Sequence, residues 1–117
     1  MPLFTIGFNH RTAPIEVRER IVFPLEAQRP ALEGLKHDTG ADEVALVSTC
    51  NRTEIYVRGA ENRVADSVTN WLMARPGAAN VNMAAHLYRF NDAEVARHAF
   101  RVACGLDSMV LGEPQIL

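Results

Sequence analysis

Cysteine and long apolar runs are both scarce in this chain of 117 residues. The two cysteines, Cys50 and Cys104, lie far apart and form no metal-binding spacing such as C-x-x-C. This predicts reduced thiols in the cytoplasm and no metal site. No apolar run approaches the roughly 18 residues of a membrane span. The first residues also lack the basic and apolar regions of a signal peptide.

Lysine is almost absent as well, since Lys36 is the only lysine among twelve basic residues and the others are arginine. Arginine suits bidentate contacts with carboxylate or phosphate groups, although a GC-rich genome would produce the same bias. The net charge of −2 gives no overall attraction to nucleic acid. Any RNA contact therefore has to come from a local group of arginines. The sequence contains no G-x-G-x-x-G, and its length leaves no room for a Rossmann unit beside a first domain.

The hydrophobic pattern predicts one α+β domain, a ferredoxin-like β-α-β-β-α-β sandwich with an extra C-terminal helix. Alternating apolar residues predict strands at 3–8, 42–49, 53–58 and 86–90. Helical periodicity predicts helices at 15–22, at 25–36 and at 60–75, the last with Val64, Val68, Trp71 and Leu72 on its apolar face.

Two details of the helices follow from single residues. Pro30 lies within the second helix and is expected to kink or split it. Asn91 is the expected N-cap of the extra helix, with Glu94 in capping-box position. That helix should run to Cys104 and be ended by Gly105.

The richest chemistry lies in residues 48–54, with the sequence STCNRTE, between two apolar strand-like runs. A connection there would ordinarily be small and bland, but this one carries a thiol, an amide, a guanidinium and a carboxylate. Because a nearby cation favours the nucleophilic thiolate, Cys50 beside Arg52 is a candidate nucleophile. A cysteine that only packs is the other interpretation. His98, at the edge of an apolar helical stripe, is by itself more typical of a packing residue than of a catalyst.

Four stretches of the sequence closely resemble the N-terminal part of glutamyl-tRNA reductases, in the same order. They are residues 7–14 (GFNHRTAP), 48–54 (STCNRTE), 98–103 (HAFRVA) and 105–117 (GLDSMVLGEPQIL). The last stretch is long enough to be far more specific than a short motif. One departure is Cys104, at a position where the family is expected to have a small residue, often serine.

The resemblance implies an enzyme that reduces the glutamate of glutamyl-tRNA to glutamate-1-semialdehyde with NADPH, on the route to 5-aminolevulinate and tetrapyrroles. Residues 1–117 would then be the single catalytic, glutamate-recognising domain of a larger, truncated enzyme. Its NADPH-binding and dimerisation domains would be absent here, so this chain should not bind NADPH. The implied partners are glutamyl-tRNA, a second copy of the full-length chain and the downstream semialdehyde aminomutase.

The resemblance also assigns roles to individual residues. The family's catalytic cysteine falls on Cys50, which would hold glutamate as a thioester. Its functionally important histidine falls on His98, which would activate the thiol or donate a proton to the leaving ribose oxygen. Arg52 is expected to pair with the substrate's side-chain carboxylate and Glu113 with its ammonium group. The implied substrate-binding residues are Thr49, Asn51, Arg52, Ser108, Glu113, Pro114 and Gln115.

Two other functions stay open at this point. A ferredoxin-like domain can bind RNA or a small effector without chemistry, although the strand faces offer few of the aromatic residues on which RNA-binding sheets stack bases. Much faster labelling of Cys50 than of Cys104 by a thiol reagent would favour the enzyme. A cysteine hydrolase or acyl transferase without a redox step is the second alternative. Acyl transfer from glutamyl-tRNA measured with and without NADPH would separate it from the reductase.

Overall fold

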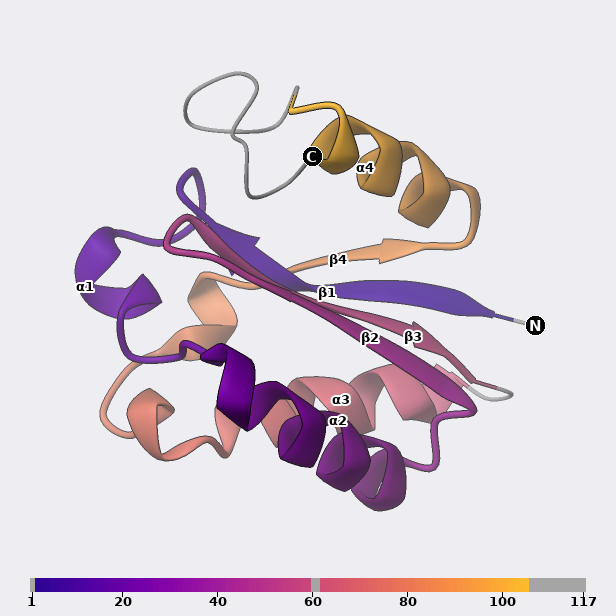
Figure 1. Cartoon of the computed structure of the whole chain (residues 1–117), viewed down its shortest axis with the longest axis horizontal. Helices are drawn as coiled ribbons and strands as arrows, with labels where there is room; N and C mark the ends of the chain where they lie inside the picture. Colours follow the sequence, from indigo (N-terminus) through magenta and orange to yellow (C-terminus); the bar gives the residue numbers. More distant parts are fainter. Residues whose placement is uncertain (1, 60–61, 106–117) are drawn as a thin grey trace.

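The structure, a computed structural model, describes residues 2–59 and 62–105. A four-stranded antiparallel sheet has α2 and α3 on one face and α4 on the other (Figure 1). The elements in chain order are β1 (Leu3–Asn9), α1 (Ile15–Arg18), α2 (Leu25–Thr39), β2 (Glu43–Ser48), β3 (Arg52–Arg58), α3 (Asn62–Met73), the short 3-10 helices η1 (Pro76–Ala78) and η2 (Met83–Ala85), β4 (Tyr88–Asn91) and α4 (Ala93–Ala103).

The strands lie side by side in the order β2-β3-β1-β4. The first strand of the chain is thus inserted between β3 and β4 and pairs with both in antiparallel fashion. This arrangement confirms the predicted α+β class and the β-α-β-β-α-β order with an additional helix, α4, at the end. None of the described helices has the length and apolar character that crossing a membrane would require.

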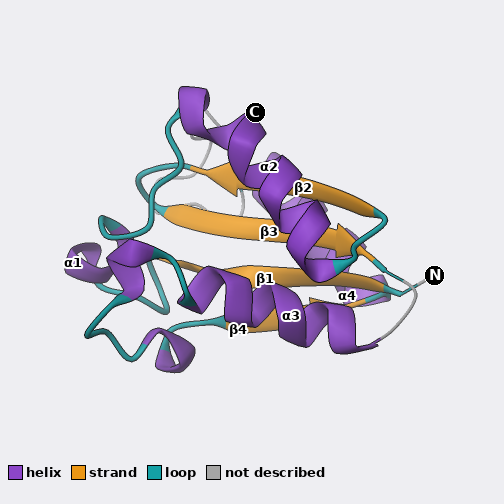
Figure 2. Ribbon diagram, turned by 90° about the horizontal axis from the view of Figure 1, so that it is seen from below, coloured by secondary structure: helices purple, strands orange, loops and turns teal. Residues whose placement is uncertain are grey.

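The apolar core lies between the sheet and the layer formed by α2 and α3, which cover that face side by side (Figure 2). Alternate residues of β1, namely Phe4, Ile6 and Phe8, are buried there, as the period of two predicted. On α3 the predicted apolar face is confirmed, because all four of its members are buried: Val64, Val68, Trp71 and Leu72.

The first two helices differ from their predictions in length. The helix expected at 15–22 ends at Arg18, after which the chain turns and places Ile21 in the core. Helix α2 continues without a break through Pro30 as far as Thr39, so the predicted split is wrong. Proline removes the hydrogen bond to the carbonyl four residues earlier. Residues 26 and 30 are both exposed, so water can bond to that carbonyl instead.

The start of α4 corrects a second prediction. The N-cap residue is Asp92 rather than Asn91, and its side chain makes no cap hydrogen bond. Asp92 Oδ1 instead accepts a hydrogen bond from the Leu3 backbone N–H at 3.1 Å, while Asn91 belongs to β4. The capping residue therefore ties the beginning of α4 to the beginning of β1. At the other end Gly105 has a φ of +74°, as expected for a glycine that ends a helix.

Candidate active site

The loop between β2 and β3 carries Cys50 at the end of the sheet where β1 also ends. Asn9, the last residue of β1, is paired with Arg52, the first residue of β3. The Thr49 N–H donates to the Arg52 carbonyl at 2.8 Å, and the Asn51 N–H donates to Thr49 Oγ1 at 3.2 Å, which fixes the loop. Cys50 is exposed and lines a cavity of about 340 Å³ beside α1. The thiol is thus accessible on an ordered loop.

A buried cation that the sequence did not reveal holds this loop in place. Arg18, at the end of α1, is 7% exposed. Its Nη1 donates to the Ala13 carbonyl at 2.8 Å, and its Nε donates to the Cys50 carbonyl at 3.3 Å. The guanidinium that contacts the Cys50 main chain is therefore that of Arg18, whereas Arg52, two residues after the thiol, points elsewhere.

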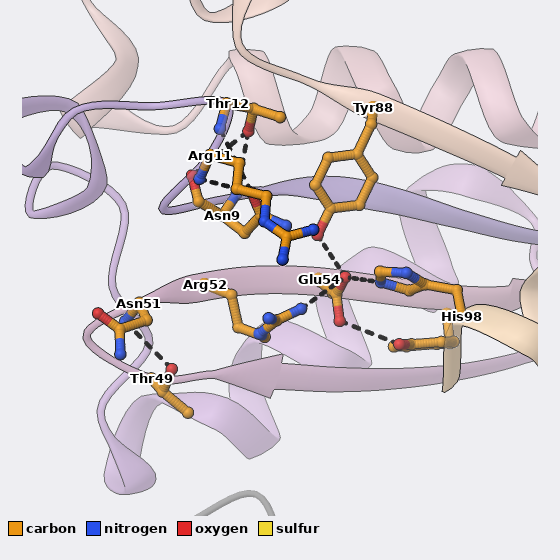
Figure 3. Close-up of polar contacts among 10 residues, drawn as sticks. Asn9, Arg11, Thr12, Thr49, Asn51, Arg52, Glu54, Tyr88 and His98 are labelled. Atoms are coloured by element: carbon orange, nitrogen blue, oxygen red, sulfur yellow. Dashed lines mark hydrogen bonds and ion pairs between the residues drawn. The ribbon is translucent and has the colours of Figure 1, made fainter. Parts of the chain in front are cut away.

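Next to the loop, on the sheet face covered by α4, five polar side chains form one group in which four surround the carboxylate of the fifth (Figure 3). Three of them come from alternate positions of β3, one from β4 and one from α4. Because side chains alternate along a strand, the three from β3 face away from the apolar core. We call this group the Glu54 cluster: Arg52, Glu54, Tyr56, Tyr88 and His98.

Glu54 is the centre of the cluster and is completely buried. Its Oε2 accepts hydrogen bonds from the Tyr88 hydroxyl and from His98 Nε2. The same oxygen lies 3.4 Å from Arg52 Nη1, in an ion pair whose two side chains are both fully buried. Glu54 Oε1 accepts a hydrogen bond from the Tyr56 hydroxyl at 3.0 Å. Each of the other four residues of the cluster therefore contacts the same carboxylate.

A glycine in β1 makes the central contact of the cluster possible. Gly7 is paired with Glu54 on one side and with Tyr88 on the other, so these three residues form one row across the sheet. A Cβ at Gly7 would meet the Thr53 carbonyl oxygen and lie 2.8 Å from Glu54 Cα. Because Gly7 has no side chain, Tyr88 reaches across β1 to a carboxylate two strands away.

The surroundings of Glu54 set its charge. Burial raises the pKa of this carboxyl, but hydrogen bonds from His98 and Tyr88 and the positive charges of His98 and Arg52 more than offset it. The pKa of Glu54 is therefore lowered from its ordinary value of 4.5, and the group is ionised at neutral pH. Burial, followed by the negative charge of Glu54, raises the pKa of Tyr88 above 10.0, so Tyr88 stays a hydrogen-bond donor.

The ionised acceptor fixes the tautomer of His98. A carboxylate has no proton to give, so His98 Nε2 must carry the hydrogen in this bond. Nδ1 is then the ring nitrogen that is not engaged with Glu54, as in other carboxylate–histidine pairs. The ring is held in place by Phe90, whose centroid lies 4.6 Å from that of the imidazole. His98 is thus both a packed residue and an oriented one.

The structure groups the predicted site residues in two sets. Thr49, Cys50 and Asn51 lie together in the β2–β3 loop, while Arg52 and His98 are joined through Glu54. His98 Nε2 donates its hydrogen bond to Glu54 and not to the thiol. The remaining predicted residues lie outside the described part of the chain, and their roles stay predictions: Ser108, Glu113, Pro114 and Gln115.

Cys104 and Glu54 show where the sequence reasoning was incomplete. Cys104, which stands where the family resemblance leads one to expect another small residue, is exposed at the end of α4 and is a second accessible thiol. In the sequence Glu54 is the last member of the polar stretch 48–54, and no pattern there gives it a role in the site. Its one signal in the sequence was its closeness to Cys50, because the burial of this strand face is visible only in the structure. Tyr88 carried no such signal.

Comparisons with known proteins agree over almost the entire chain. Residues 6–117 match the family described as glutamyl-tRNAGlu reductase, N-terminal domain. The glutamyl-tRNA reductases of Pseudoalteromonas atlantica and Xylella fastidiosa strain M12 are 50% and 52% identical to it over 100% of this chain, which covers 27% and 26% of their lengths. The solved glutamyl-tRNA reductase from Methanopyrus kandleri superimposes with a TM-score of 0.74 at 29% identity, over 97% of this chain and 25% of that one. The chain thus spans about a quarter of the length of these relatives.

Proposed function

Because this chain belongs to the family of glutamyl-tRNAGlu reductase N-terminal domains, we propose that it performs the acyl-transfer step of glutamyl-tRNA reduction in the cytoplasm. The Cys50 thiolate attacks the ester carbonyl that joins glutamate to tRNA. A C–S bond forms as the ester C–O bond breaks, and the proton lost by the thiol ends on the departing ribose oxygen. In the whole enzyme the thioester would then be reduced with NADPH to glutamate-1-semialdehyde for tetrapyrrole synthesis.

The observation that supports this proposal most is the position of a buried, ionised cluster next to an exposed thiol. Arg52 and Glu54 are both 0% exposed, and Arg52 follows Cys50 by only two residues. Burying a charge pair is costly and adds little to stability compared with apolar packing. Groups with perturbed pKa values gather at functional sites, and the pKa of Glu54 is perturbed by specific partners. The buried pair of Arg52 and Glu54 is therefore better explained by a functional role than by a contribution to folding.

His98 is proposed to move the proton. Glu54 holds the imidazole through Nε2 and stabilises the positive charge that develops when Nδ1 accepts a proton. The same nitrogen can then protonate the ribose oxygen as it leaves, so one residue serves as base and then as acid. In this proposal Glu54 is a positioning residue, because it acts through His98 and not on the ester itself.

Substrate recognition is proposed for residues of both sets. On the family resemblance, Arg52 is the proposed partner of the substrate's side-chain carboxylate, because a guanidinium binds a carboxylate in a two-pronged geometry. Thr49 and Asn51 would contact glutamate from the loop. The roles proposed for Ser108, Glu113, Pro114 and Gln115 rest on the family resemblance alone.

The described residues do not fit a dinucleotide. All their strand pairs are antiparallel, whereas a Rossmann site needs parallel strands and a glycine-rich turn before a helix. NADPH is therefore proposed for the whole enzyme, and no residue of this chain is given a part in hydride transfer. Homodimerisation through a further domain and contact with the semialdehyde aminomutase are proposed on the resemblance alone.

The test is covalent capture of labelled glutamate. The chain is mixed with glutamyl-tRNA labelled in the amino acid, quenched in acid, and analysed for label that stays with the protein and is released by hydroxylamine. Cys50→Ala should abolish capture, and Cys104→Ala, which removes the other exposed thiol, should leave it nearly intact. Equal labelling of wild type and Cys50→Ala would refute the proposal.

A further inference from the structure

A second cavity, of about 270 Å³, opens beside His98, and arginines dominate its walls. Four of its residues form one stripe on α4, at spacings of three, four and seven. The loop after β1 and strand β4 each add one more. The lining residues are Arg11, Phe90, Glu94, Arg97, His98 and Arg101.

Two of these arginines have no acidic partner within the described part of the chain. Elsewhere the exposed arginines of strands form ion pairs, as Arg58 does with Glu43 at 2.7 Å and Arg89 with Asp66 at 3.2 Å. No such pair involves Arg97 or Arg101. Arg97 and Arg101 are four residues apart on α4, and like charges at this spacing destabilise a helix by about 0.2–0.5 kcal/mol.

The cavity therefore has a local excess of positive charge in a chain whose net charge is −2. Arg97 and Arg101 share this cavity with one acid, Glu94. A positive cavity on a slightly acidic protein attracts anions to that place and not to the surface in general.

We propose that Arg97 and Arg101, with Arg11, bind phosphate groups of RNA adjacent to its acylated 3′ end. This inference rests on the proposed function, in which the ester under attack is attached to the last nucleotide of tRNA. Phosphates of the terminal nucleotides must then lie close to the reacting ester. His98 belongs both to this cavity and to the Glu54 cluster, so RNA held here presents its ribose beside the histidine proposed to protonate it.

The chemistry of the surface favours single-stranded RNA. Guanidinium groups bind phosphate oxygens in a two-pronged geometry. Phe100 lies three residues after Arg97 and one before Arg101, and it is 72% exposed, which is unusual for phenylalanine. An exposed aromatic ring beside these cations on the same helix offers an unpaired base a surface on which to stack. The pairing of cations with an aromatic ring is what proteins use on single strands.

Binding of uncharged transfer RNA to the chain, measured by fluorescence anisotropy at several salt concentrations, tests the proposal. Neutralising one phosphate contributes about 0.7 to 0.9 to the slope of log K against log salt. Arg97→Gln/Arg101→Gln should lower that slope by roughly 1.4 to 1.8 and weaken binding roughly 25- to 60-fold at about 0.1 M salt. Arg97→Lys/Arg101→Lys should keep most of the affinity, since lysine also binds phosphate as a point charge.

A matched control is Arg20→Gln/Arg29→Gln. Both arginines are exposed, lie outside this cavity, and change the net charge by the same amount when replaced. This control should leave affinity and salt slope close to wild type. An equal loss in both double variants would mean that only total charge matters and would overturn the proposal. Unchanged RNA binding in Arg97→Gln/Arg101→Gln would also overturn the proposal. The same holds if this variant loses binding to phosphatidylserine vesicles but keeps its RNA binding.

The assay separates this inference from the proposed function. Uncharged RNA undergoes no chemistry, so Cys50→Ala should bind it as tightly as wild type. If glutamate capture fails while the salt-dependent binding holds, the thioester step is wrong and the RNA surface stands. If capture succeeds and the arginine variants bind RNA normally, the RNA surface is wrong and the thioester step stands.

Discussion

The two faces of one sheet are built from the same strands but have opposite characters. On the face toward α2 and α3, β3 contributes Ile55 and Val57 to a core of apolar side chains. On the face toward α4, the residues between and beside them, such as Glu54 and Tyr56, join a buried polar network. Alternation along a strand lets a single segment serve both faces.

The difference indicates that the α2/α3 face contributes mainly to stability and the α4 face mainly to the proposed site. Apolar burial on the α2/α3 face gives a stabilising free energy of roughly 25 cal/mol for each Å² removed from water. The α4 face buries an ion pair, and a buried ion pair adds little to the free energy of unfolding compared with apolar packing. Its value lies in fixing the orientation of His98. Substitutions on the first face should therefore change the free energy of unfolding, and those on the second should mainly change glutamate capture.

The largest effect should come from the apolar face. Phe8 is 0% exposed, and Phe8→Ala removes a ring from the core and leaves a cavity. We expect the free energy of unfolding in urea to fall by about 3–5 kcal/mol. The fraction of protein that stays folded should still capture glutamate. A folded variant that has lost capture would show that the two faces are not separable.

A substitution at Arg52 tests whether the polar face depends on the shape of this side chain when its charge is kept. Arg52→Lys keeps the charge but loses the two-pronged contact with carboxylates. Glutamate capture should fall roughly tenfold to a hundredfold, as expected when about 1.5–3 kcal/mol of charge-assisted hydrogen bonding is lost. Arg52→Ala should be only slightly worse. Circular dichroism must show that both variants fold, and nearly full activity of the lysine variant would reduce Arg52 to general electrostatics.

Glu54 tests whether the network acts through its charge. Glu54→Gln keeps the shape but removes the negative charge that pairs with Arg52 and orients His98. We expect a loss of roughly 1–3 kcal/mol in the free energy of unfolding together with a clear loss of capture. Slower capture should not be accompanied by weaker binding of uncharged tRNA, since Glu54 lies outside the arginine cavity. Wild-type capture in this variant would contradict the positioning role.

The polar face should also give stability a dependence on pH. Because the pKa of Glu54 is lowered in the folded state, its contribution is complete above pH 4.5 and disappears as the pH falls through the lowered value. Because the pKa of Tyr88 is raised, its contribution is complete below pH 10.0 and disappears as the pH rises. Urea unfolding across pH should show a flatter acid limb in Glu54→Gln and a flatter alkaline limb in Tyr88→Phe. Unaltered limbs would exclude these groups as the cause.

The smallest effects are expected for two substitutions at neighbouring residues of β3 that face opposite sides of the sheet. Ile55→Val removes one methylene from the core, and Tyr56→Phe removes the hydroxyl that donates to Glu54. Each should lower the free energy of unfolding by about 0.5–1.5 kcal/mol. Only Tyr56→Phe should slow glutamate capture. If Ile55→Val slows capture equally, the comparison between the faces fails.

Much of the fold could be predicted because apolar alternation and helical period report directly on burial. The faces of β1 and α3 are examples. Boundaries were less predictable where a side chain had a distant partner. Asp92 became the N-cap of α4, and its carboxylate bonds to Leu3 at the other end of the chain. No local pattern contains that contact.

The site was predictable only in part, and for the same reason. The stretch around Cys50 stood out because it concentrates reactive groups, and His98 stood out through family resemblance. The link between them required knowing that α4 covers the polar face of β3, and Tyr88 reaches Glu54 only across Gly7. The buried role of Arg18 likewise depends on a contact with a loop 32 residues away.

The chain order of the two faces also matters while the protein is being made. Helices α2 and α3 and strands β1 to β3 lie within residues 3–73, and the core residues Ala78 and Met83 follow them, whereas β4 and α4, which bring Tyr88 and His98, begin at residue 88. A ribosome working from the amino terminus therefore releases all residues of the apolar layer up to Met83 before it has made α4, the helix that covers the polar face. Until then Glu54 faces water, which a carboxylate tolerates and an apolar surface does not. The face that would aggregate if left open is the face that can close first.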